Sequence, residues 1–483
     1  MSPQPQLPPL YCALGGENTV LQDSEIKATL HNFLASFDNI QNLLILPPDF
    51  TRFHSQAGKI TQFIDEYFHN DGGMNEVKQT IMPALGTHTP MTPNQIRTMF
   101  GDKLADADSS RAEFVVHNWR TDVVTIGEVP AEMVRKATSD NLDVPWPAQL
   151  NKLIWEKKHD LILSVGQVVP HEVMGMANFN KNLFVGCGGV DAINLSHFIG
   201  AVHGMENMMG KGDNPLRDIL NYASENFLEK KLPLWYILTV MGTNECTGDL
   251  EMKGFYIGND IECYKQACEL SLKVNFVLLD KPLKNVVCFL DKDEFHSTWL
   301  GNKAIYRTRM ALADGGKLTV LAPGVKQFGE DEQVDILIRK YGYVGTPNIM
   351  EQMRENSELK DNLSAVAHLI HGSSEGRFDV VYCPGSLSRE EIEGVGYAYS
   401  DLEPMLARYD IDKLKDGWNT LPDGEELYFI SNPALGLWAA RERFENDSCV
   451  NPNTSLSVTQ ISPQESSDQS GGVGGWARPP STS

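Results

Sequence analysis

Two histidines and a lysine occur at set intervals in one glycine- and asparagine-rich stretch of the sequence. Lys181 follows His171 by 10 residues, and His197 follows Lys181 by 16. These intervals fit neither one face of a helix nor one strand. Imidazoles can bind a metal or move protons. The stretch therefore indicates a loop that gathers reactive side chains.

Three glycines follow the lysine in this stretch, at positions 186, 188 and 189. A backbone without side chains can bring its N–H groups close to a phosphate, so Gly186, Gly188 and Gly189 are candidate phosphate contacts. Neither of the two common glycine-rich nucleotide motifs, GxGxxG and GxxxxGK[ST], occurs here. The glycines alone are a weak indication.

Two earlier loops carry further polar residues directly after short apolar runs. These residues are Asp49, Thr51 and Arg52 in PPDFTRFHS (47–55) and His88 in GTHTPM (86–91). Arginine offers a planar fork for a carboxylate or a phosphate, and histidine can act as an acid or a base. Each residue taken singly also fits a turn or a hydrogen-bonded structural role. Three such loops after three strands favour one functional site.

Two basic residues occur late in the chain. Lys303 is predicted near the start of a helix that ends at Gly315–Gly316, and Arg307 lies one turn later. Cations on a helix are usually solvated, so the pattern by itself leaves a surface role and a functional role open.

The apolar pattern predicts the fold class. Short apolar runs that end in turn residues alternate with amphipathic segments; the runs are 43–48, 80–86, 161–166, 317–324, 379–385 and 426–433. This alternation is typical of α/β layers with parallel sheets, in which functional loops follow the carboxyl ends of strands. One helix start is well marked, with Thr92 as N-cap, Pro93 as the first helical residue and Gln95 completing a capping box.

We therefore predict two α/β domains with mostly parallel sheets and the active site in the cleft between them. Residues 1–268 are assigned to an N-terminal cofactor-binding and catalytic domain, and residues 269–445 to a C-terminal domain that contributes substrate-binding residues. The Ser-, Pro- and Gly-rich tail at 446–483 is expected to be disordered.

Composition excludes several classes of function. The sequence has 41 Lys and Arg against 64 Asp and Glu, a formal net charge of −23, which disfavours partners such as nucleic acid or an anionic membrane. The N-terminus lacks the pattern of a signal peptide, and no apolar run approaches the ~18 residues of a membrane span. Eight scattered cysteines without CxxC pairs are expected to be reduced thiols. A cytoplasmic enzyme is the expectation.

Together the motifs resemble the lactate racemase family that uses a nickel-pincer nucleotide. The resemblance covers about residues 40–435 and rests on four motifs in the order found in the family: DFTR (49–52), GTHTPM (86–91), the His171/Lys181/His197 series with GCGG (186–189), and Lys303 before Gly315–Gly316. It implies a racemase or epimerase, an isomerase that inverts C2 of an α-hydroxy acid. The substrate would be lactate or a larger hydroxy or sugar acid. Inversion would occur by hydride transfer to and from the cofactor through a 2-keto acid.

The resemblance also implies roles for single residues. His88 and His171 match the two catalytic histidines, and His197 matches the nickel ligand. Lys181 matches the lysine that holds nickel pyridinium-3,5-bisthiocarboxylic acid mononucleotide through a thioamide. Further matches are Asp49, Thr51 and the three glycines for the nucleotide, and Arg52 and Lys303 for the substrate carboxylate. The expected partners are a small anionic 2-hydroxy acid and the proteins that synthesise the cofactor.

One departure and two alternatives accompany this interpretation. Ala177, Asn178 and Phe179 stand where the family's characterised racemase has Ser-Gly-Gly before the lysine. A nickel- or nucleotide-binding carrier without turnover would need only Lys181, His197 and the glycines. A zinc hydrolase built on the three histidines is a further alternative, although the sequence lacks an HExxH pair or another compact ligand set.

Overall fold

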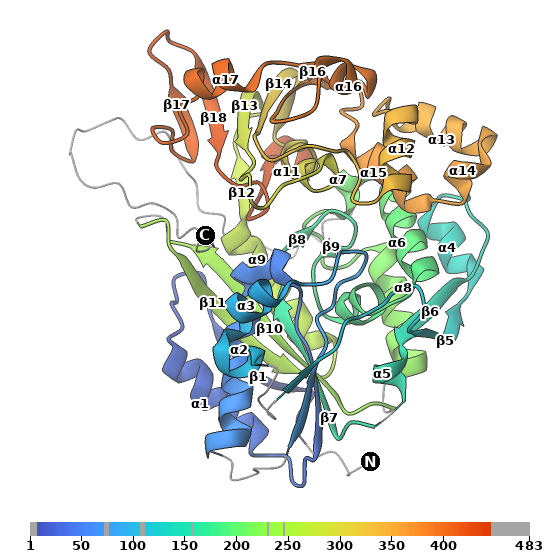
Figure 1. Ribbon diagram of the computed structural model, residues 1–483, viewed down its shortest axis with the longest axis vertical. Helices are drawn as coiled ribbons and strands as arrows, with labels where there is room; N and C mark the ends of the chain where they lie inside the picture. Colours follow the sequence, from blue (N-terminus) through green and yellow to red (C-terminus); the bar gives the residue numbers. More distant parts are fainter. Residues whose placement is uncertain are drawn as a thin grey trace.

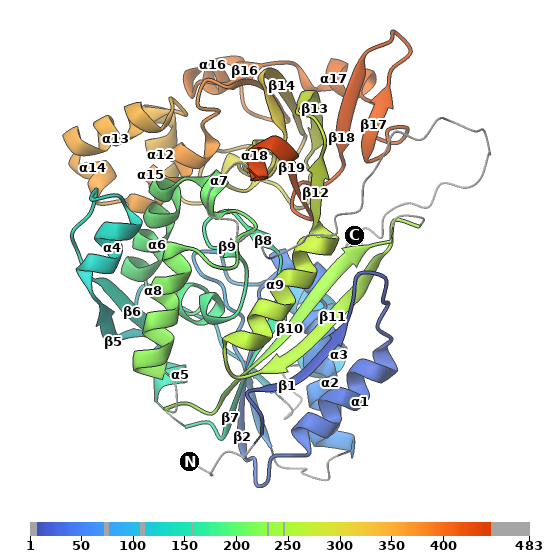
Figure 2. The ribbon, with the colours of Figure 1, turned by 180° about the vertical axis from the view of Figure 1, so that it is seen from behind.

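The chain folds into two lobes, one above the other, in the view of Figure 1. The computed structural model describes residues 7–71, 77–106, 112–156, 158–228, 231–244 and 247–445. The N-terminal lobe contains the elements from β1 to α9, and the C-terminal lobe those from β12 to α18. Figure 2 shows the same division from behind, with helix α9 crossing one face of the lower sheet.

The N-terminal lobe is built on a seven-stranded sheet whose central strands are parallel. Only the strands β11 and β1 at one edge run antiparallel to their neighbours. In spatial order the strands are β1 (Leu10–Gly15), β11 (Leu250–Gly258), β10 (Leu234–Thr243), β7 (Leu161–Gln167), β2 (Asn42–Leu46), β3 (Lys78–Ile81) and β4 (Ala112–Phe114). The predicted strands at 43–48 and 161–166 are confirmed. The strand predicted at 80–86 ends earlier, at Ile81, and only Ala84 makes a further bridge, to Pro48.

Helices cover both faces of this sheet because its strands alternate apolar side chains between two cores. Leu43 and Ile45 of β2 belong to the core under α1 (Asp23–Leu34), α2 (Ala57–Glu66) and α3 (Pro93–Ala105). Leu44 and Leu46 point to the opposite core, under α6 (Val190–His203), α8 (Pro215–Ala223) and α9 (Ile261–Asn275). A strand buried on both faces is typical of a parallel sheet.

The predicted start of α3 is confirmed. The Thr92 hydroxyl accepts a hydrogen bond from the backbone N–H of Gln95 (3.2 Å), and the Gln95 side chain accepts one from the N–H of Thr92 (2.9 Å). Pro93 occupies the first turn. This capping box fixes the point at which the loop carrying His88 ends.

The C-terminal lobe contains a six-stranded sheet with a single antiparallel edge strand, β17. Its order is β16 (Ala398–Tyr399), β15 (Phe378–Pro384), β14 (Leu312–Ala322), β13 (Leu283–Phe289), β18 (Glu426–Ile430) and β17 (Gly417–Thr420). One face packs against α11 (Lys303–Thr308), α12 (Glu332–Tyr341) and α15 (Leu363–Gly372), and the other against α17 (Leu402–Arg408). The predicted mostly parallel α/β architecture is confirmed in both lobes.

Short elements complete the two lobes. Three two-stranded sheets pair β5 (Val123–Val129) with β6 (Trp146–Asn151), β8 (Pro170–His171) with β9 (Gly175–Met176), and β12 (Phe276–Leu279) with β19 (Leu437–Ala440). The remaining α-helices are α4 (Ala131–Ala137), α5 (Lys152–Trp155), α7 (Met205–Met208), α10 (Thr298–Gly301), α13 (Thr346–Glu355), α14 (Ser357–Lys360), α16 (Arg389–Gly394) and α18 (Arg441–Glu445).

The helix predicted from Lys303 to Gly315–Gly316 is wrong at its end. Helix α11 stops at Thr308, and the two glycines lie inside strand β14. The pairing of β14 with β13 shifts register at this point, and Gly315 has a φ of +70°. The glycine pair therefore marks a bulge in a strand, which a sequence pattern does not distinguish from the end of a helix.

The boundary predicted after residue 268 falls inside α9, which packs on the N-terminal sheet, so the domain limits stay a prediction. Helix α6 joins the lobes, because its Phe198 and Ala201 belong to the C-terminal core. The predicted disordered tail at 446–483 lies outside the described residues. Six cysteines lie within them, all free and buried.

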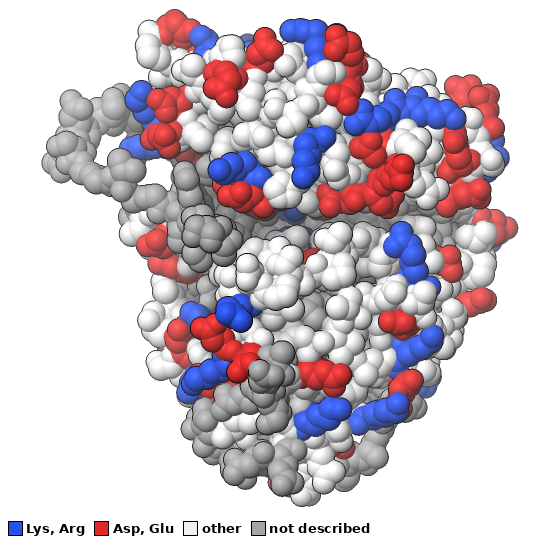
Figure 3. All heavy atoms as spheres, in the orientation of Figure 1, with Lys and Arg blue, Asp and Glu red and all other residues white. Residues whose placement is uncertain are grey.

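Charges of both signs are interspersed on the face shown in Figure 3, where Lys and Arg side chains lie among Asp and Glu side chains on both lobes. In the part of the chain that the structure describes, none of the helices has the length and apolar character needed to cross a membrane.

Candidate functional site

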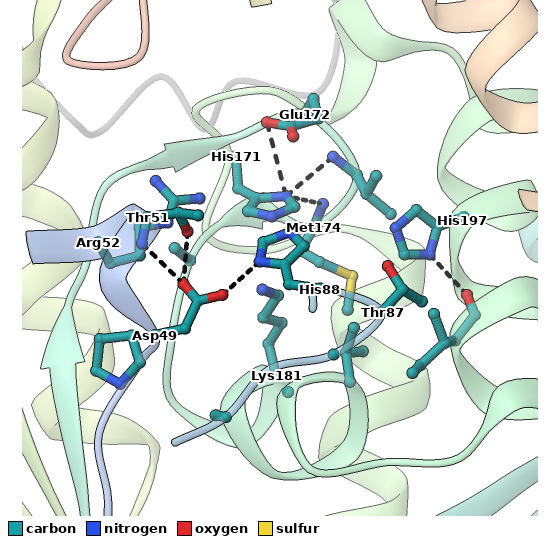
Figure 4. A pocket seen from close by; sticks show the side chains of 18 of the residues that line it. Asp49, Thr51, Arg52, Thr87, His88, His171, Glu172, Met174, Lys181 and His197 are labelled. Atoms are coloured by element: carbon teal, nitrogen blue, oxygen red, sulfur yellow. Dashed lines mark hydrogen bonds and ion pairs between the residues drawn. The ribbon is translucent and has the colours of Figure 1, made fainter. Parts of the chain in front are cut away.

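The three loops singled out in the sequence meet at one edge of the N-terminal sheet. They follow β2, β3 and β7, which are adjacent parallel strands in the order β7–β2–β3. A pocket at this edge lies between the lobes. Its walls include the candidate residues Asp49, Thr51, Arg52, His88, His171, Lys181, Gly186, His197 and Lys303. Figure 4 shows the side chains of His88, His171, Lys181 and His197 converging on one space.

His88 is paired with a buried carboxylate. Its Nδ1 lies 2.6 Å from Oδ2 of Asp49, which is only 4% exposed. Asp49 also accepts hydrogen bonds from the backbone N–H (3.1 Å) and the hydroxyl (2.6 Å) of Thr51. Burial would raise the pKa of Asp49, but His88 and the hydrogen bonds from His88 and Thr51 lower it below its ordinary value. The ionised carboxylate accepts the proton on Nδ1, so Nε2 of a neutral His88 is a proton acceptor.

His171 is held in the opposite tautomer. Its Nδ1 accepts backbone N–H groups from Val173 (3.1 Å) and Met174 (3.4 Å) in the turn between β8 and β9. A neutral ring with an accepting Nδ1 carries its proton on Nε2. Burial lowers the pKa of His171 well below its ordinary value, although the neighbouring Glu172 opposes this effect. The two imidazoles therefore present different edges, an acceptor on His88 and a donor on His171.

A buried ion pair beside His171 was missed by the sequence analysis. Glu172 Oε2 lies 3.4 Å from Nη2 of Arg307, whose side chain is fully buried. Burial would raise the pKa of Glu172, but the surrounding charges, including those of Arg307 and Lys303, hold it well below its ordinary value. This pair joins the two lobes beside the pocket. No local signal could have paired two residues 135 positions apart.

Lys181 has no hydrogen bond or ion pair to another residue in the part of the chain that the structure describes, although it points into a pocket of polar groups. Removal from water and the nearby charge of Arg52 lower the pKa of the amine to about 8. An appreciable fraction of the amine is therefore uncharged at neutral to mildly alkaline pH. An uncharged amine is a nucleophile, whereas an ammonium is not.

His197 projects into the pocket from helix α6. Its Nδ1 donates a 2.7 Å hydrogen bond to the backbone carbonyl of Ile193, which leaves the Nε2 lone pair available. A backbone carbonyl therefore orients the ring, and the side chain of the adjacent Asn194 instead accepts a hydrogen bond from Ser364. The described residues contain no group of three His, Cys, Asp or Glu side chains placed to hold a metal ion. A metal at His197 would take its other ligands from a bound molecule.

The loop before Lys181 has two residues with positive φ, a conformation that favours glycine, but neither residue is a glycine. Asn178 (φ +65°) and Phe179 (φ +58°) are both left-handed. The Phe179 ring stacks on Tyr264 at 5.2 Å. Buried Arg217 donates hydrogen bonds to the carbonyl of Met176 (2.6 Å) and the side chain of Asn180 (2.5 Å). These contacts hold the conformation that replaces the Ser-Gly-Gly path.

Two cations in the pocket lack a direct carboxylate partner among the described residues. Arg52 follows β2, and Lys303 lies at the start of α11 with only 9% of its surface exposed. Arg307 differs from both because it pairs with Glu172. The solvated-helix interpretation of Lys303 and Arg307 is wrong, since both side chains are buried.

The glycines divide into two groups. Gly186 lines the pocket, whereas Gly188 and Gly189 do not belong to its walls. A Cβ on Gly188 would lie 1.8 Å from the carbonyl oxygen of Phe184, and one on Gly189 would lie 2.4 Å from the side chain of Gln149. Close packing therefore accounts for these two glycines.

The C-terminal lobe supplies a further wall that the sequence analysis did not identify, apart from Lys303. Its aromatic and polar members are Trp299, Tyr306, Ser364, His368 and His371. Trp299 stacks on His368 with ring centroids 4.5 Å apart. The apolar pattern of α15 indicates a buried helix. No further signal in the sequence distinguishes these pocket-lining residues from residues of the core.

Part of the chain matches a known protein family. Residues 19–210 match the lactate racemase N-terminal domain. A lactate racemase from Thermoanaerobacterium thermosaccharolyticum is 24% identical over 292 residues, 58% of this chain and 60% of that protein, so the match spans less than two thirds of the relative. Its apoprotein structure is 17% identical, with a TM-score of 0.61 over 88% of this chain and 91% of that one.

A crystal structure of a Thermotoga maritima protein is more similar in fold. It is 22% identical, with a TM-score of 0.75 over 89% of this chain and 100% of that one. At this identity, the two structures establish the fold alone. The matched N-terminal domain, the curated relative and the shared fold agree. Residues 19–210 therefore match the lactate racemase N-terminal domain, and the chain shares the fold of a lactate racemase apoprotein.

Proposed function

We propose that the protein is a racemase or epimerase that inverts C2 of a 2-hydroxy acid. The observation that carries this proposal is the pair of imidazoles with opposite hydrogen-bonding edges, His88 and His171, in one pocket with an unpaired amine and two unpaired cations. Inversion requires proton exchange with the substrate oxygen on two sides, and each side needs a group able to exchange it.

We propose that the cofactor is a nickel-pincer nucleotide, because the residues present fit it. The free Nε2 of His197 is a nitrogen donor of the kind nickel accepts, and the remaining ligands would come from the nucleotide. The uncharged amine of Lys181 would form the thioamide, and Asp49, Thr51 and Gly186 would contact the nucleotide. When bound, the cofactor supplies reversible hydride acceptance.

The chain's own residues would manage the proton and the substrate. In one direction, Nε2 of His88 takes the hydroxyl proton while Asp49 stabilises the imidazolium. His171 would return a proton to the keto intermediate through Nε2, which requires that Nδ1 carry a proton during that step in place of the hydrogen bonds it accepts from Val173 and Met174. Arg52 and Lys303 would neutralise the substrate carboxylate, because neither is already paired with a protein carboxylate in the described part of the chain.

A carrier without turnover explains fewer of these contacts. It needs Lys181 and His197 but gives no reason for two further imidazoles in different tautomers. A zinc hydrolase would require three protein ligands at one point, and the described residues provide no such set.

The function is tested by incubating the holoenzyme with single enantiomers of several 2-hydroxy acids. Chiral chromatography should show formation of the opposite C2 configuration, with retention of the carbon skeleton. Bound nickel and nucleotide without inversion of any acid would favour the carrier. Hydrolysis by a zinc-loaded protein would favour the hydrolase.

Covalent attachment at Lys181 is a separate expected result. Intact-protein mass spectrometry of denatured holoenzyme should show an adduct of nucleotide size that maps to Lys181, because the amine has a pKa of about 8 and no protein partner in the described residues. Lys181→Arg should remove the adduct, whereas Lys211→Arg, on a residue outside the pocket walls, should keep it. A bare chain mass in denatured enzyme that still holds nickel and nucleotide when native would show that the tether is absent.

A further inference from the structure

Two side chains on the C-terminal wall of the pocket are buried without hydrogen-bond partners. His371 on α15 and Tyr306 on α11 are each only 4% exposed, and both line the pocket. Among the described residues, no group bonds to either ring nitrogen of His371 or to the Tyr306 hydroxyl. Only Nε2 of His371 is fully shielded, so Nδ1 of His371 and the Tyr306 hydroxyl are the atoms that a molecule in the pocket can reach. Buried polar groups without partners are rare because they lose their bonds to water and gain nothing in exchange.

His368 and Ser364, which line the same wall, have hydrogen-bond partners within the protein. His368 bonds to the Tyr343 hydroxyl (2.9 Å), which also bonds to Thr298 (2.9 Å). Ser364 donates to Asn194 (2.6 Å). His371 and Tyr306 differ from these two wall residues because their side chains have no hydrogen-bond partner among the described residues. Both face the same pocket as the unpaired cation Lys303, one helical turn before Tyr306.

Both groups are neutral hydrogen-bonding partners. Burial lowers the pKa of His371 to about 3 and raises the pKa of Tyr306 well above its ordinary value. A neutral imidazole and a phenol suit hydroxyl groups, which donate and accept, better than a second carboxylate. The charges of Arg52 and Lys303 remain for the single carboxylate at C1.

We propose that His371 and Tyr306 form a subsite for hydroxyl groups at C3 and beyond, so that the substrate is a polyhydroxy (aldonic) acid. This inference rests on the proposed C2 inversion and names its substrate class. Lactate has only a methyl group beyond C2 and would leave both side chains unpaired. An aryl substituent would favour the apolar part of the wall, Trp299 and Leu300, and is the competing occupant.

The test compares the holoenzyme on gluconate, lactate and 3-phenyllactate. We expect kcat/KM for C2 inversion to be at least about tenfold higher with gluconate than with lactate, since one neutral hydrogen bond contributes up to about tenfold. His371→Leu and Tyr306→Phe should each lower the gluconate value about tenfold and leave the lactate value nearly unchanged. His371→Gln, which keeps a donor and an acceptor, should retain most of the gluconate activity.

Tyr382→Phe is the matched control. The Tyr382 hydroxyl is also buried without a partner among the described residues, but Tyr382 is not part of the pocket wall. The kcat/KM values of this variant for all three acids should equal those of the parent enzyme. A preference for lactate or phenyllactate, or an equal loss on lactate and gluconate in the two subsite variants, would overturn the subsite.

Calorimetry separates failure of the subsite from failure of the proposed function. If no acid is inverted but gluconate binds, and His371→Leu and Tyr306→Phe weaken that binding, the subsite stands and C2 inversion is wrong. If gluconate does not bind, or binds the variants as tightly as the parent, the subsite is wrong.

Discussion

Replacing His88 with alanine is expected to reduce C2 inversion by ~10²–10⁴-fold, the usual cost of removing a positioned acid–base group. The reason is geometric. Asp49 holds the proton of His88 on Nδ1, so Nε2 is the accepting nitrogen in the pocket. Inversion is measured by chiral chromatography, and nickel and nucleotide contents are measured on the same preparation. Both contents should stay close to those of the parent enzyme.

Two further variants sharpen this result. His171→Ala should cause a loss of the same order, because inversion needs a proton on the second side. His54→Ala is the matched control, since His54 belongs to η1 (Phe50–Ser55), directly after Asp49, but does not line the pocket. Near-parental turnover in either active-site variant would remove that histidine from the proposed chemistry.

Replacing His197 with alanine is expected to abolish stoichiometric nickel binding. Its Nε2 is the only imidazole nitrogen assigned to the metal, and the described residues offer no set of side chains to replace it. Loss of a ligand from a site with few protein donors leaves the metal dependent on the nucleotide alone. Elemental analysis of the purified variant measures the loss, and activity should fall with the nickel content.

His203→Ala is the matched control for this experiment, because His203 ends the same helix outside the pocket walls. The variant should keep nickel and activity. Nickel retained at one equivalent in His197→Ala would mean that the metal lies elsewhere in the site. An adduct on Lys181 that persists in the nickel-free variant would separate tethering from metal binding.

The sequence predicted the sheets and the meeting of the loops because both depend on local patterns. Apolar runs such as 43–48 and 161–166 become strands wherever both faces are covered, and the carboxyl ends of adjacent parallel strands share one edge. Asp49, His88 and His171 therefore come together without any long-range information. The capping box at Thr92 is likewise complete within four residues.

Other features depend on pairings that a sequence does not reveal. The Glu172–Arg307 ion pair joins the two lobes. The lack of a hydrogen-bond partner for Nε2 of His371 depends on which groups surround the ring after folding. The glycines were ambiguous for a related reason. Glycine is favoured where two backbone segments approach closely, in a turn and in a β-bulge, so its presence does not tell these cases apart. In the structure, Gly188 lies in close packing and Gly315 lies in a bulge.

A reversible reaction passes through the same protonation states in both directions. If His171 exchanges a proton with the substrate through Nε2, its Nδ1 must carry a proton both before and after the exchange. A protonated Nδ1 cannot accept the N–H groups of Val173 and Met174 that it accepts in this structure. Either the turn between β8 and β9 opens or the ring rotates in each cycle, and faster amide exchange at Val173 and Met174 during turnover would report the opening. Under the proposed function, the turn between β8 and β9 would thus couple a local conformational change to catalysis, and the resting hydrogen bonds would favour the enantiomer whose hydroxyl faces His88.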